Sequence, residues 1–538
     1  MSVGSHHLYD AAATRRIDAA AGADWGLDGA TLMARAGDAA FDALTERWPQ
    51  VRQILVLAGG GNNAGDGYVV ARAAQAAGIK VTLAQLLPPP TDGSAHAHSE
   101  ALAQTDIARI DATAVPVWCA TAAESAAPGS VVVVDAVFGS GLRRAVTAPL
   151  DTLFAKLNAI GLPTLALDIP SGVSADSGAV LGAALRADLT VTFIVPKLGL
   201  YTGRGVDYVG ALVLADLGVP ERACAGIAAV AETFSYSSTA SAFGPRPRSA
   251  HKGDFGHVLV IGGGEGMPGA ALLAGMAAAR TGAGLVTIAT WPSHAGALVA
   301  ACPSLMVQPV ASPADLAPLV ERAGVLVVGP GLGRSPWADA MLETALEAQR
   351  PLVLDADALN LLAGAPPQAR VGAPAVMTPH PGEAARLLGW DVETVNADRV
   401  AAARAIGERY DATCVLKGAG SIVASASSAA LAGVCTDGNP GMASAGMGDV
   451  LSGVIGSMLG QFYAAPPAQP AEAQVSPKKS PPAGGRLRRP EILGLSLAQA
   501  VRLAVALHAK AGDLAAEDGP RGLVAGDLLP ALRTLVNP

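Results

Sequence analysis

Cysteine is scarce in this sequence, and the few cysteines are scattered. Five occur, at Cys119, Cys224, Cys302, Cys414 and Cys435, and none belongs to a CxxC or Cys/His pattern. Neither a zinc site nor a disulfide framework is therefore predicted. The first ten residues also lack the basic and apolar run of a signal peptide, so we expect a reduced, cytoplasmic setting.

Charged and aromatic residues are also few, at 15% and 4% of 538 residues. The net charge of −8 argues against a basic surface that coats nucleic acid, and we expect no nucleic-acid partner. Hydrophobic residues make up 51% of the chain, and its length suits two domains. A stretch rich in Pro, Ala, Gln and basic residues, 464–490, is interpreted as a flexible insertion.

One long run has no charge at all. Residues 281–314 contain no Asp, Glu, Lys or Arg, and this length could cross a bilayer. Four prolines and His294 interrupt the run, which excludes a continuous apolar helix. We expect buried strands and loops here, and no membrane segment.

The first part of the chain alternates short apolar runs with helical patterns. Gln53–Ala58 predicts a strand, Gly59–Gly67 a glycine loop and Tyr68–Ala77 a helix. Continuous apolar runs suit strands that are buried on both faces of a parallel sheet. The pattern therefore predicts a three-layer, Rossmann-like α/β domain. The further strands are expected at 80–86, 131–134, 163–167 and 189–195.

A second α/β series follows a change in composition. Residues 232–248 are rich in Ser, Thr, Pro and Arg, which indicates a linker between a domain at 1–231 and another at 249–538. The strands of the second series are expected at 257–261, 324–328, 351–354, 375–377 and 412–416.

Polar residues follow three strands of the first series. Ligands of open parallel sheets bind at the loops beyond the carboxyl ends of the strands. The glycine loop there lets backbone N–H groups approach a phosphate, and the neighbouring side-chain oxygens suit a hard cation. The alternative is ordinary turn chemistry, because a single glycine loop without GxGxxG spacing is weak support for a site. The polar residues are Asn62, Asn63, Asp66, Asp135, Asp168 and Ser171.

The second series has a glycine-rich segment, 437–449, before an apolar helix at Val450–Leu459. Gly446 and Gly448 free the backbone to wrap an anion, and Asp449 is placed to accept a proton from a substrate hydroxyl. The alternative is that Asp449 only caps the helix. Other loops at strand ends favour a site, namely 329–333, 354–360, 378–383 with His380, and 417–421 with Lys417.

The motifs GGGNNAGDG (59–67), VDAVFGSGL (134–142) and DIPSG (168–172) closely resemble the NAD(P)H-hydrate epimerase family. The resemblance implies a potassium ion at Asn63, Asp135 and Ser171, and it implies that Asp168 touches the substrate; we interpret Asp168 as the acid/base. The residues implied to contact the hydrated cofactor are Asn62, Asn63, Ala64, Gly65, Asp66, Gly139, Ser140, Gly141, Leu142, Arg143, Arg144, Ala145 and Asp168.

The segments GNPGMA (438–443) and GMGDVLSG (446–453) make the second half similar to the ribokinase-like superfamily, and more narrowly to ADP- or ATP-dependent NAD(P)H-hydrate dehydratases. The match runs from His251 to Asp527, apart from the insertion. It implies phosphorylation of the substrate hydroxyl with Asp449 as base, followed by loss of phosphate. The implied substrate contacts are Ala270, Gly333, His380 and Asp449, and the implied nucleotide contacts are Lys417, Gly418, Ala419, Gly420, Ser421 and Gly448.

Together the two halves predict a bifunctional repair enzyme for hydrated NADH and NADPH. It would use ADP or ATP as co-substrate with magnesium and potassium ions, and we expect a homo-oligomer. A ribokinase-like kinase of a sugar or vitamin precursor is the main alternative, and a binding protein with decayed sites is another. The fused first half favours repair, because hydration gives two epimers and a dehydratase of one needs an epimerase for the other.

Overall fold

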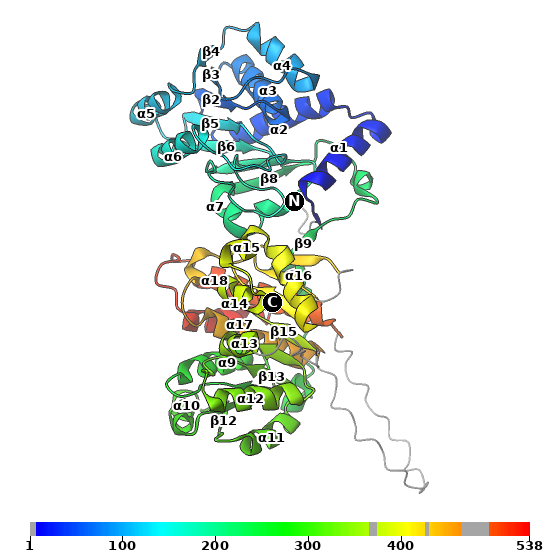
Figure 1. The fold of residues 1–538 in the computed structure, drawn as a ribbon, viewed down its shortest axis with the longest axis vertical. Helices are drawn as coiled ribbons and strands as arrows, with labels where there is room; N and C mark the ends of the chain where they lie inside the picture. Colours follow the sequence, from blue (N-terminus) through cyan, green and yellow to red (C-terminus); the bar gives the residue numbers. More distant parts are fainter. Residues whose placement is uncertain (1–6, 365–373, 426–429, 464–493) are drawn as a thin grey trace. The chain divides into compact units, whose positions relative to one another are not determined.

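The structure is a computed structural model that describes residues 7–364, 374–425, 430–463 and 494–538. The chain forms two compact units, one up to Glu232 and one from Thr233–Val395 with Arg399–Pro538. Figure 1 shows each unit as strands covered by helices. The expected insertion at 464–490 lies outside the described residues.

The sheet of the first unit has seven strands, all parallel, in the order β4-β3-β2-β5-β6-β7-β8. The chain starts this sheet at β2 and returns to its neighbour β5, so the strand order reverses between these two strands. Ligands of doubly wound sheets bind at such a switch point. The strands are β2 (Gln53–Ala58), β3 (Lys80–Gln85), β4 (Ala108–Ile110), β5 (Val131–Ala136), β6 (Thr164–Leu167), β7 (Leu189–Phe193) and β8 (Ala211–Ala215).

Helices cover both faces of this sheet. α2 (Gly29–Arg47), α3 (Asn62–Ala76) and α4 (Gly93–Ala103) pack together over one face, and α5 (Val115–Ser125) and α6 (Leu150–Ile160) pack over the other. Strand residues of alternate parity supply the two cores, because successive side chains point to opposite faces. Shorter or peripheral elements are β1 (His7–Leu8), α1 (Ala11–Trp25), α7 (Val206–Val209) and the 3₁₀ helices Leu198–Leu200, Gly203–Gly205 and Glu221–Cys224.

The second unit has a mixed sheet with the order β9-β18-β17-β16-β15-β14-β13-β10-β11-β12. The strands from β16 to β12 in this order are parallel, and β17 and β18 continue antiparallel. The switch point lies between β10 and β13. The strands are β9 (Ala231–Phe234), β10 (His257–Ile261), β11 (Leu285–Thr290), β12 (Met306–Pro309), β13 (Val325–Val328), β14 (Leu352–Leu354), β15 (Ala375–Met377), β16 (Thr413–Leu416), β17 (Ile422–Ala424) and β18 (Ala432–Cys435).

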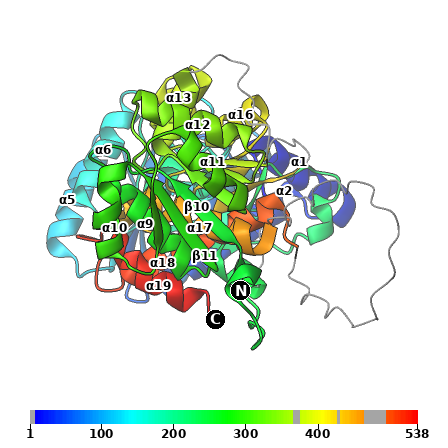
Figure 2. The same cartoon turned by 90° about the horizontal axis from the view of Figure 1, so that it is seen from below.

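Two helical layers enclose this sheet, as Figure 2 shows from below. One layer contains α9 (Pro268–Arg280), α17 (Met447–Met458), α18 (Leu497–Ala515) and α19 (Leu528–Leu535), and its apolar residues form one continuous core with the strands. α10 (Ala295–Ala301) follows β11. The other layer contains α11 (Pro313–Arg322), α12 (Pro336–Glu347), α13 (Ala356–Gly364), α14 (Pro381–Leu388), α15 (Val392–Ala397) and α16 (Arg399–Tyr410).

Several expectations about local structure need correction. The helix after β2 begins at Asn62 and not at Tyr68, so residues 62–67 of the expected glycine loop are the first turns of α3. The charge-free run 281–314 contains strands β11 and β12, as expected, but also helix α10. Residues 232–248 hold the end of β9 and a short helix, α8 (Tyr236–Thr239), in place of a plain linker. Within the described residues, no helix is long and apolar enough to cross a membrane.

Candidate active sites

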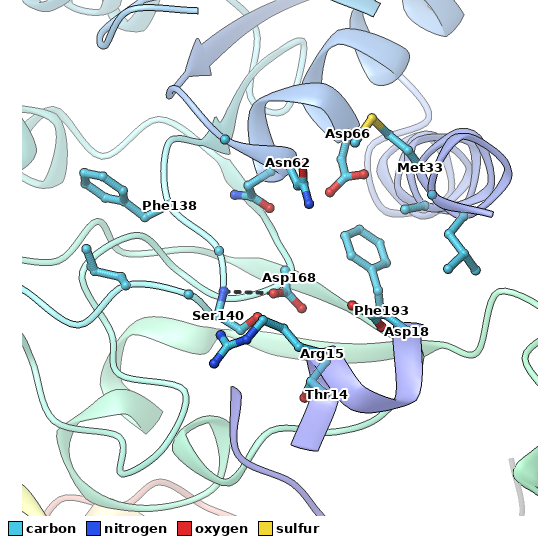
Figure 3. Close-up of a pocket in the computed structure, with 18 of the residues that line it drawn as sticks. Thr14, Arg15, Asp18, Met33, Asn62, Asp66, Phe138, Ser140, Asp168 and Phe193 are labelled. Atoms are coloured by element: carbon cyan, nitrogen blue, oxygen red, sulfur yellow. Dashed lines mark hydrogen bonds between the residues drawn. The ribbon is translucent and has the colours of Figure 1, made fainter. Parts of the chain in front are cut away.

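The first unit contains a cavity of about 1190 Å³ at its switch point. Figure 3 shows side chains from α1, α3 and the loops after β5 and β6 surrounding it. Most of the predicted substrate contacts line this cavity: Asn62, Asn63, Asp66, Gly139, Ser140, Gly141, Leu142, Arg143, Arg144 and Asp168. Ala64, Gly65 and Ala145 do not line it, and Gly65 instead faces Met33, where a Cβ would come within 2.4 Å of the sulfur. The glycine at 65 is therefore explained by close helix packing.

Asp168 follows β6 and has a left-handed backbone, with φ of 64°. Its Oδ1 lies 2.6 Å from the Nζ of Lys197, and its Oδ2 accepts a hydrogen bond of 3.0 Å from the Ser140 N–H. Burial opposes the charge of Asp168, but Lys197 and Ser140 outweigh it and lower the pKa of the carboxyl below its usual value. Asp168 is therefore an ionised group that faces the cavity.

Lys197 is a residue that the sequence reasoning missed. Its side chain is 1% exposed, and its Nζ donates to the Phe193 carbonyl at 2.7 Å and to the Thr192 hydroxyl at 3.1 Å. These two hydrogen bonds and the ion pair with Asp168 hold the ammonium group in place. A signal was present, since Lys197 comes two residues after the expected strand 189–195.

The residues that the resemblance implies for potassium, Asn63, Asp135 and Ser171, can be tested for their fit to a cation. Asp135 and Ser171 are fully buried, and Asp135 accepts hydrogen bonds from the Ser171 hydroxyl at 2.6 Å and the Ser171 N–H at 2.8 Å. Burial raises the pKa of Asp135 to about 6. Both side-chain polar atoms of Asn63 are buried and have no hydrogen-bond partner within the described chain. A buried carboxylate and an unpartnered amide oxygen therefore fit a hard cation.

The second unit places Asp355 at the centre of a polar cluster after β14. Asp355 is 1% exposed and accepts hydrogen bonds from Lys417 at 2.8 Å, Ser452 at 2.7 Å and Thr378 at 2.7 Å. Burial would raise its pKa, but these partners, Lys417 above all, lower it below the usual value. The loop 354–360 was expected from the sequence to belong to a site, but Asp355 was given no role.

Lys417 begins the glycine-rich loop between β16 and β17. Its side chain is 20% exposed, and its Nζ also lies 3.8 Å from Glu383. Burial disfavours the charge, but Asp355 and Glu383 outweigh it and raise the pKa of Lys417. The loop closes on itself through the Ser421 hydroxyl, which donates to the Gly418 carbonyl at 3.0 Å. Backbone groups and a partly exposed cation thus lie together, as phosphate binding requires.

Asp449 lies in the first turn of α17, whose N-terminus can stabilise an anion. Gly446 precedes the helix with φ of 86°, and no side chain caps this end, so the alternative role of Asp449 as helix cap is wrong. A Cβ at Gly448 would lie 3.2 Å from the Lys417 Nζ, which brings the two predicted nucleotide contacts together. Burial first, and then Asp355, raise the pKa of Asp449 to about 7.

The remaining predicted residues lie in the loops after β13 and β15 and in the first turn of α9. His380 caps α14, where its Nδ1 accepts a 3.0 Å hydrogen bond from Gly382, and its own N–H donates to Glu383. The Gly333 N–H donates to Asp357 at 2.9 Å. Ala270 is in the first turn of α9, and its Cβ approaches the loop after β13 at Gly331.

Fold and site together define a class: a Rossmann-like domain with a cavity lined by carboxyl groups, followed by a ribokinase-like α/β domain whose helix α17 has a glycine-rich start. A model of the NAD(P)H-hydrate dehydratase family matches residues 258–532, and one described as YjeF-related protein N-terminus matches residues 29–199. The chain belongs to the family of bifunctional NAD(P)H-hydrate repair enzymes. The predicted fold class, family and two enzymatic activities are confirmed.

Relatives of that name are similar over nearly the whole chain. The one from Coxiella burnetii is 44% identical over 94% of this chain and 95% of its own length. The one from Escherichia coli is 40% identical over 99% of this chain and 94% of its own. Among solved structures, an ADP/ATP-dependent NAD(P)H-hydrate dehydratase from Bacillus subtilis, co-crystallised with ATP/Mg²⁺, is 25% identical over 56% of this chain and 95% of that one, with a TM-score of 0.44.

Proposed function

We propose that the cavity of the first unit interconverts the R and S forms of hydrated NADH and NADPH, and that the second unit dehydrates the S form at the expense of ADP or ATP. The observation that supports one reaction in each unit is that each has its own aspartate–lysine ion pair beside a proposed ligand-binding loop. Two separate polar centres in two separate units support two separate reactions.

In the first unit, Asp168 would touch the substrate as the acid/base. Its ionised state favours the role of proton acceptor, because a carboxylate that is kept charged by a lysine is ready to take a proton. Asn62 and the loop 139–144 line the same cavity and would hold the rest of the dinucleotide, with Arg143 and Arg144 available for phosphates.

Asn63, Asp135 and Ser171 would hold a potassium ion. The unpartnered amide oxygen of Asn63 and the buried carboxylate of Asp135 support this assignment. The ion would supply positive charge for substrate binding near the loop at Gly139, where a Cβ would lie 3.4 Å from the Asn63 amide. Replacing potassium with sodium in the assay should weaken epimerisation more than dehydration.

In the second unit, Asp449 would take the proton of the substrate hydroxyl while that oxygen attacks the terminal phosphoryl group of the nucleotide. Phosphate would then leave with its bonding electrons as the ring nitrogen forms a C=N bond. Loss of a proton from the neighbouring ring carbon to solvent or to the departing phosphate would re-form the ring double bond, which restores the reduced nicotinamide. Lys417 and the loop 417–421 would hold the nucleotide phosphates, with Gly448 at the start of α17. Ala270, Gly333 and His380 would contact the substrate.

Magnesium would be held by the nucleotide phosphates. Asp355 and Glu383, the two carboxylates beside Lys417, offer oxygen atoms of the kind that magnesium prefers. When bound, it would offset phosphate charge. Resemblance favours ADP as the co-substrate. ADP and ATP should therefore be compared at equal concentration, with hydrated NADH and hydrated NADPH as substrates.

The assay that tests the whole proposal follows the return of nicotinamide absorbance from a mixture of both epimers. With nucleotide present, the wild-type protein should consume both forms. A panel of sugar and vitamin-precursor alcohols tests the kinase alternative, which would be favoured if phosphorylation of one of these replaced dehydration. Purified protein that leaves both epimers unchanged would contradict the proposal.

A further inference from the structure

Three carboxyl groups and one ammonium group meet in the cavity of the first unit. Asp18 comes from α1, Asp66 from α3 and Asp168 from the loop after β6, and all three line the cavity together with Lys197. Of the three, Asp168 is the partner of Lys197, at 2.6 Å. Figure 3 shows Asp66 entering the cavity from a different side than Asp168.

Among the described residues that line the cavity, Lys197 forms an ion pair with Asp168, whereas Arg15, Arg143 and Arg144 lie exposed on its rim. A second buried carboxylate without an ion-pair partner tends to keep its proton. Burial first, and then the charge of Asp168, raise the pKa of Asp66 well above its ordinary value. Asp66 and Asp168 therefore differ in protonation although they share a cavity, which is the arrangement by which enzymes separate an acid from a base.

We propose that Asp66 is the proton donor of epimerisation, that Asp168 is the proton acceptor, and that Lys197 is a positioning residue that keeps Asp168 ionised and oriented. This inference rests on the proposed epimerase site and assigns roles within it.

The chemistry of the substrate needs both groups. Water adds to an enamine so that the hydroxyl is bonded to the carbon beside the ring nitrogen. Asp66 gives its proton to this hydroxyl, the C–O bond breaks, water leaves, and the nitrogen lone pair forms a C=N bond. A water molecule then adds to the opposite face, and its proton goes to Asp168. The reverse reaction uses Asp168 as donor and Asp66 as acceptor, and solvent exchange restores the starting protonation.

Asp18 is the competing candidate for the donor. Its Oδ1 is buried without a hydrogen-bond partner in the described chain, and burial raises its pKa to about 6 against the lowering effect of Lys197. At neutral pH most of Asp18 would thus be ionised and unable to donate. Asp66 also belongs to α3, the helix that presents Asn62 and Asn63 to the cavity.

The test compares Asp66→Asn with the matched variant Asp18→Asn in the full chain, without nucleotide, so that only epimerisation occurs. Interconversion of the separated epimers is followed by chromatography between pH 5 and pH 9. Asp66→Asn should lose about 100-fold or more in kcat, with little change in KM, and its residual rate should no longer fall at alkaline pH. Asp18→Asn should keep the alkaline fall.

Two further measurements support the comparison. Circular dichroism and thermal unfolding, measured on the same preparations, show whether the first unit of each variant is folded. A difference infrared spectrum at neutral pH, wild type minus Asp66→Asn, should contain the carbonyl band of a protonated carboxylic acid, and this spectrum stays informative if the variant is inactive for other reasons.

The inference is overturned if Asp66→Asn keeps the alkaline fall, if its loss is confined to KM, or if the carbonyl band is absent. In those cases an inactive Asp168→Asn variant would leave the proposed epimerase site standing. Wild-type protein that fails to interconvert the epimers would instead overturn the proposed function itself.

Discussion

The two units use the same pair of residue types in opposite ways. In the first unit Lys197 is buried with two hydrogen bonds and its ion pair to Asp168, and Asp168 faces the cavity. In the second unit Asp355 is buried with three side-chain donors, and Lys417 is the partly exposed partner. The exposed member is the one that can meet a ligand, so the first unit offers a carboxylate and the second offers a cation.

The largest effects should come from removing the proposed base of each unit. Asp449→Asn should reduce dehydration by about 100-fold or more and leave epimerisation unchanged, because a neutral amide cannot accept the hydroxyl proton. Asp168→Asn should do the reverse. Both rates are measured on each variant, and a joint loss of both activities in either folded variant would contradict the separation of the sites.

Lys417→Met should weaken the binding of the nucleotide more than the binding of the hydrated cofactor. The loss of a charge-assisted contact to phosphate should raise the KM for ADP about tenfold or more, with a smaller change for the S-form substrate. Steady-state kinetics in both substrates checks this. A change confined to the cofactor KM would mean that Lys417 faces the other ligand.

Lys197→Met should change the pH dependence of epimerisation. Lys197 lowers the pKa of Asp168, so its removal should raise that pKa and move the acidic fall in rate to higher pH. A purely structural role would lower the rate at every pH and leave the profile where it was. The wild-type profile, recorded without nucleotide, is the reference.

Dehydration should depend on pH through Asp449. Because the base must be ionised and its pKa is raised to about 7, kcat/KM should fall about tenfold per unit below that pH and level off above it. Asp355 contributes to the raised pKa, so Asp355→Asn should move the acidic fall to lower pH in any protein that remains folded. A profile that is flat between pH 5 and pH 8 would exclude Asp449 as the base.

The smallest effect is expected from removing one of the hydrogen-bond donors to Asp355. Ser452→Ala removes one hydrogen bond of 2.7 Å and should lower the free energy of unfolding by about 1–3 kcal/mol, because Asp355 is left with an unsatisfied buried oxygen. Urea unfolding measures this, with Ser421→Ala, in the exposed loop, as the control. Equal stability of the two variants would mean that water replaces the lost donor.

The sequence predicted strand positions well, because continuous apolar runs buried on both faces leave little choice. β2, β10 and β15 have the predicted bounds. The start of α3 was missed because Asn62 to Gly67 has turn-like composition, and these residues are helical only since Gly65 and Gly67 allow close packing against Met33 and Ala136. Tertiary packing overrides local propensity there.

Site residues were predicted where a motif or a strand end marked them, and missed where only the fold brings partners together. Lys197 is 29 positions from Asp168, and Asp355 is 62 positions from Lys417 and 97 from Ser452. No local spacing reveals such pairs. Asp18 comes from α1, which precedes the matched family segment at 29–199, and only the cavity shows that it is near Asp168.

The left-handed backbone at Asp168 places the proposed acid/base of epimerisation at a cost in thermal stability. A side chain at a φ of 64° costs about 1 kcal/mol relative to glycine, and here that residue also bears a buried charge. Selection of this chain for heat tolerance alone would favour glycine at position 168 only together with a neutral residue at position 197, because glycine alone would leave the buried Lys197 ammonium without its counter-charge. Such a lineage would keep its nucleotide-driven half, lose the isomerase, and accumulate the epimer that the surviving half cannot use.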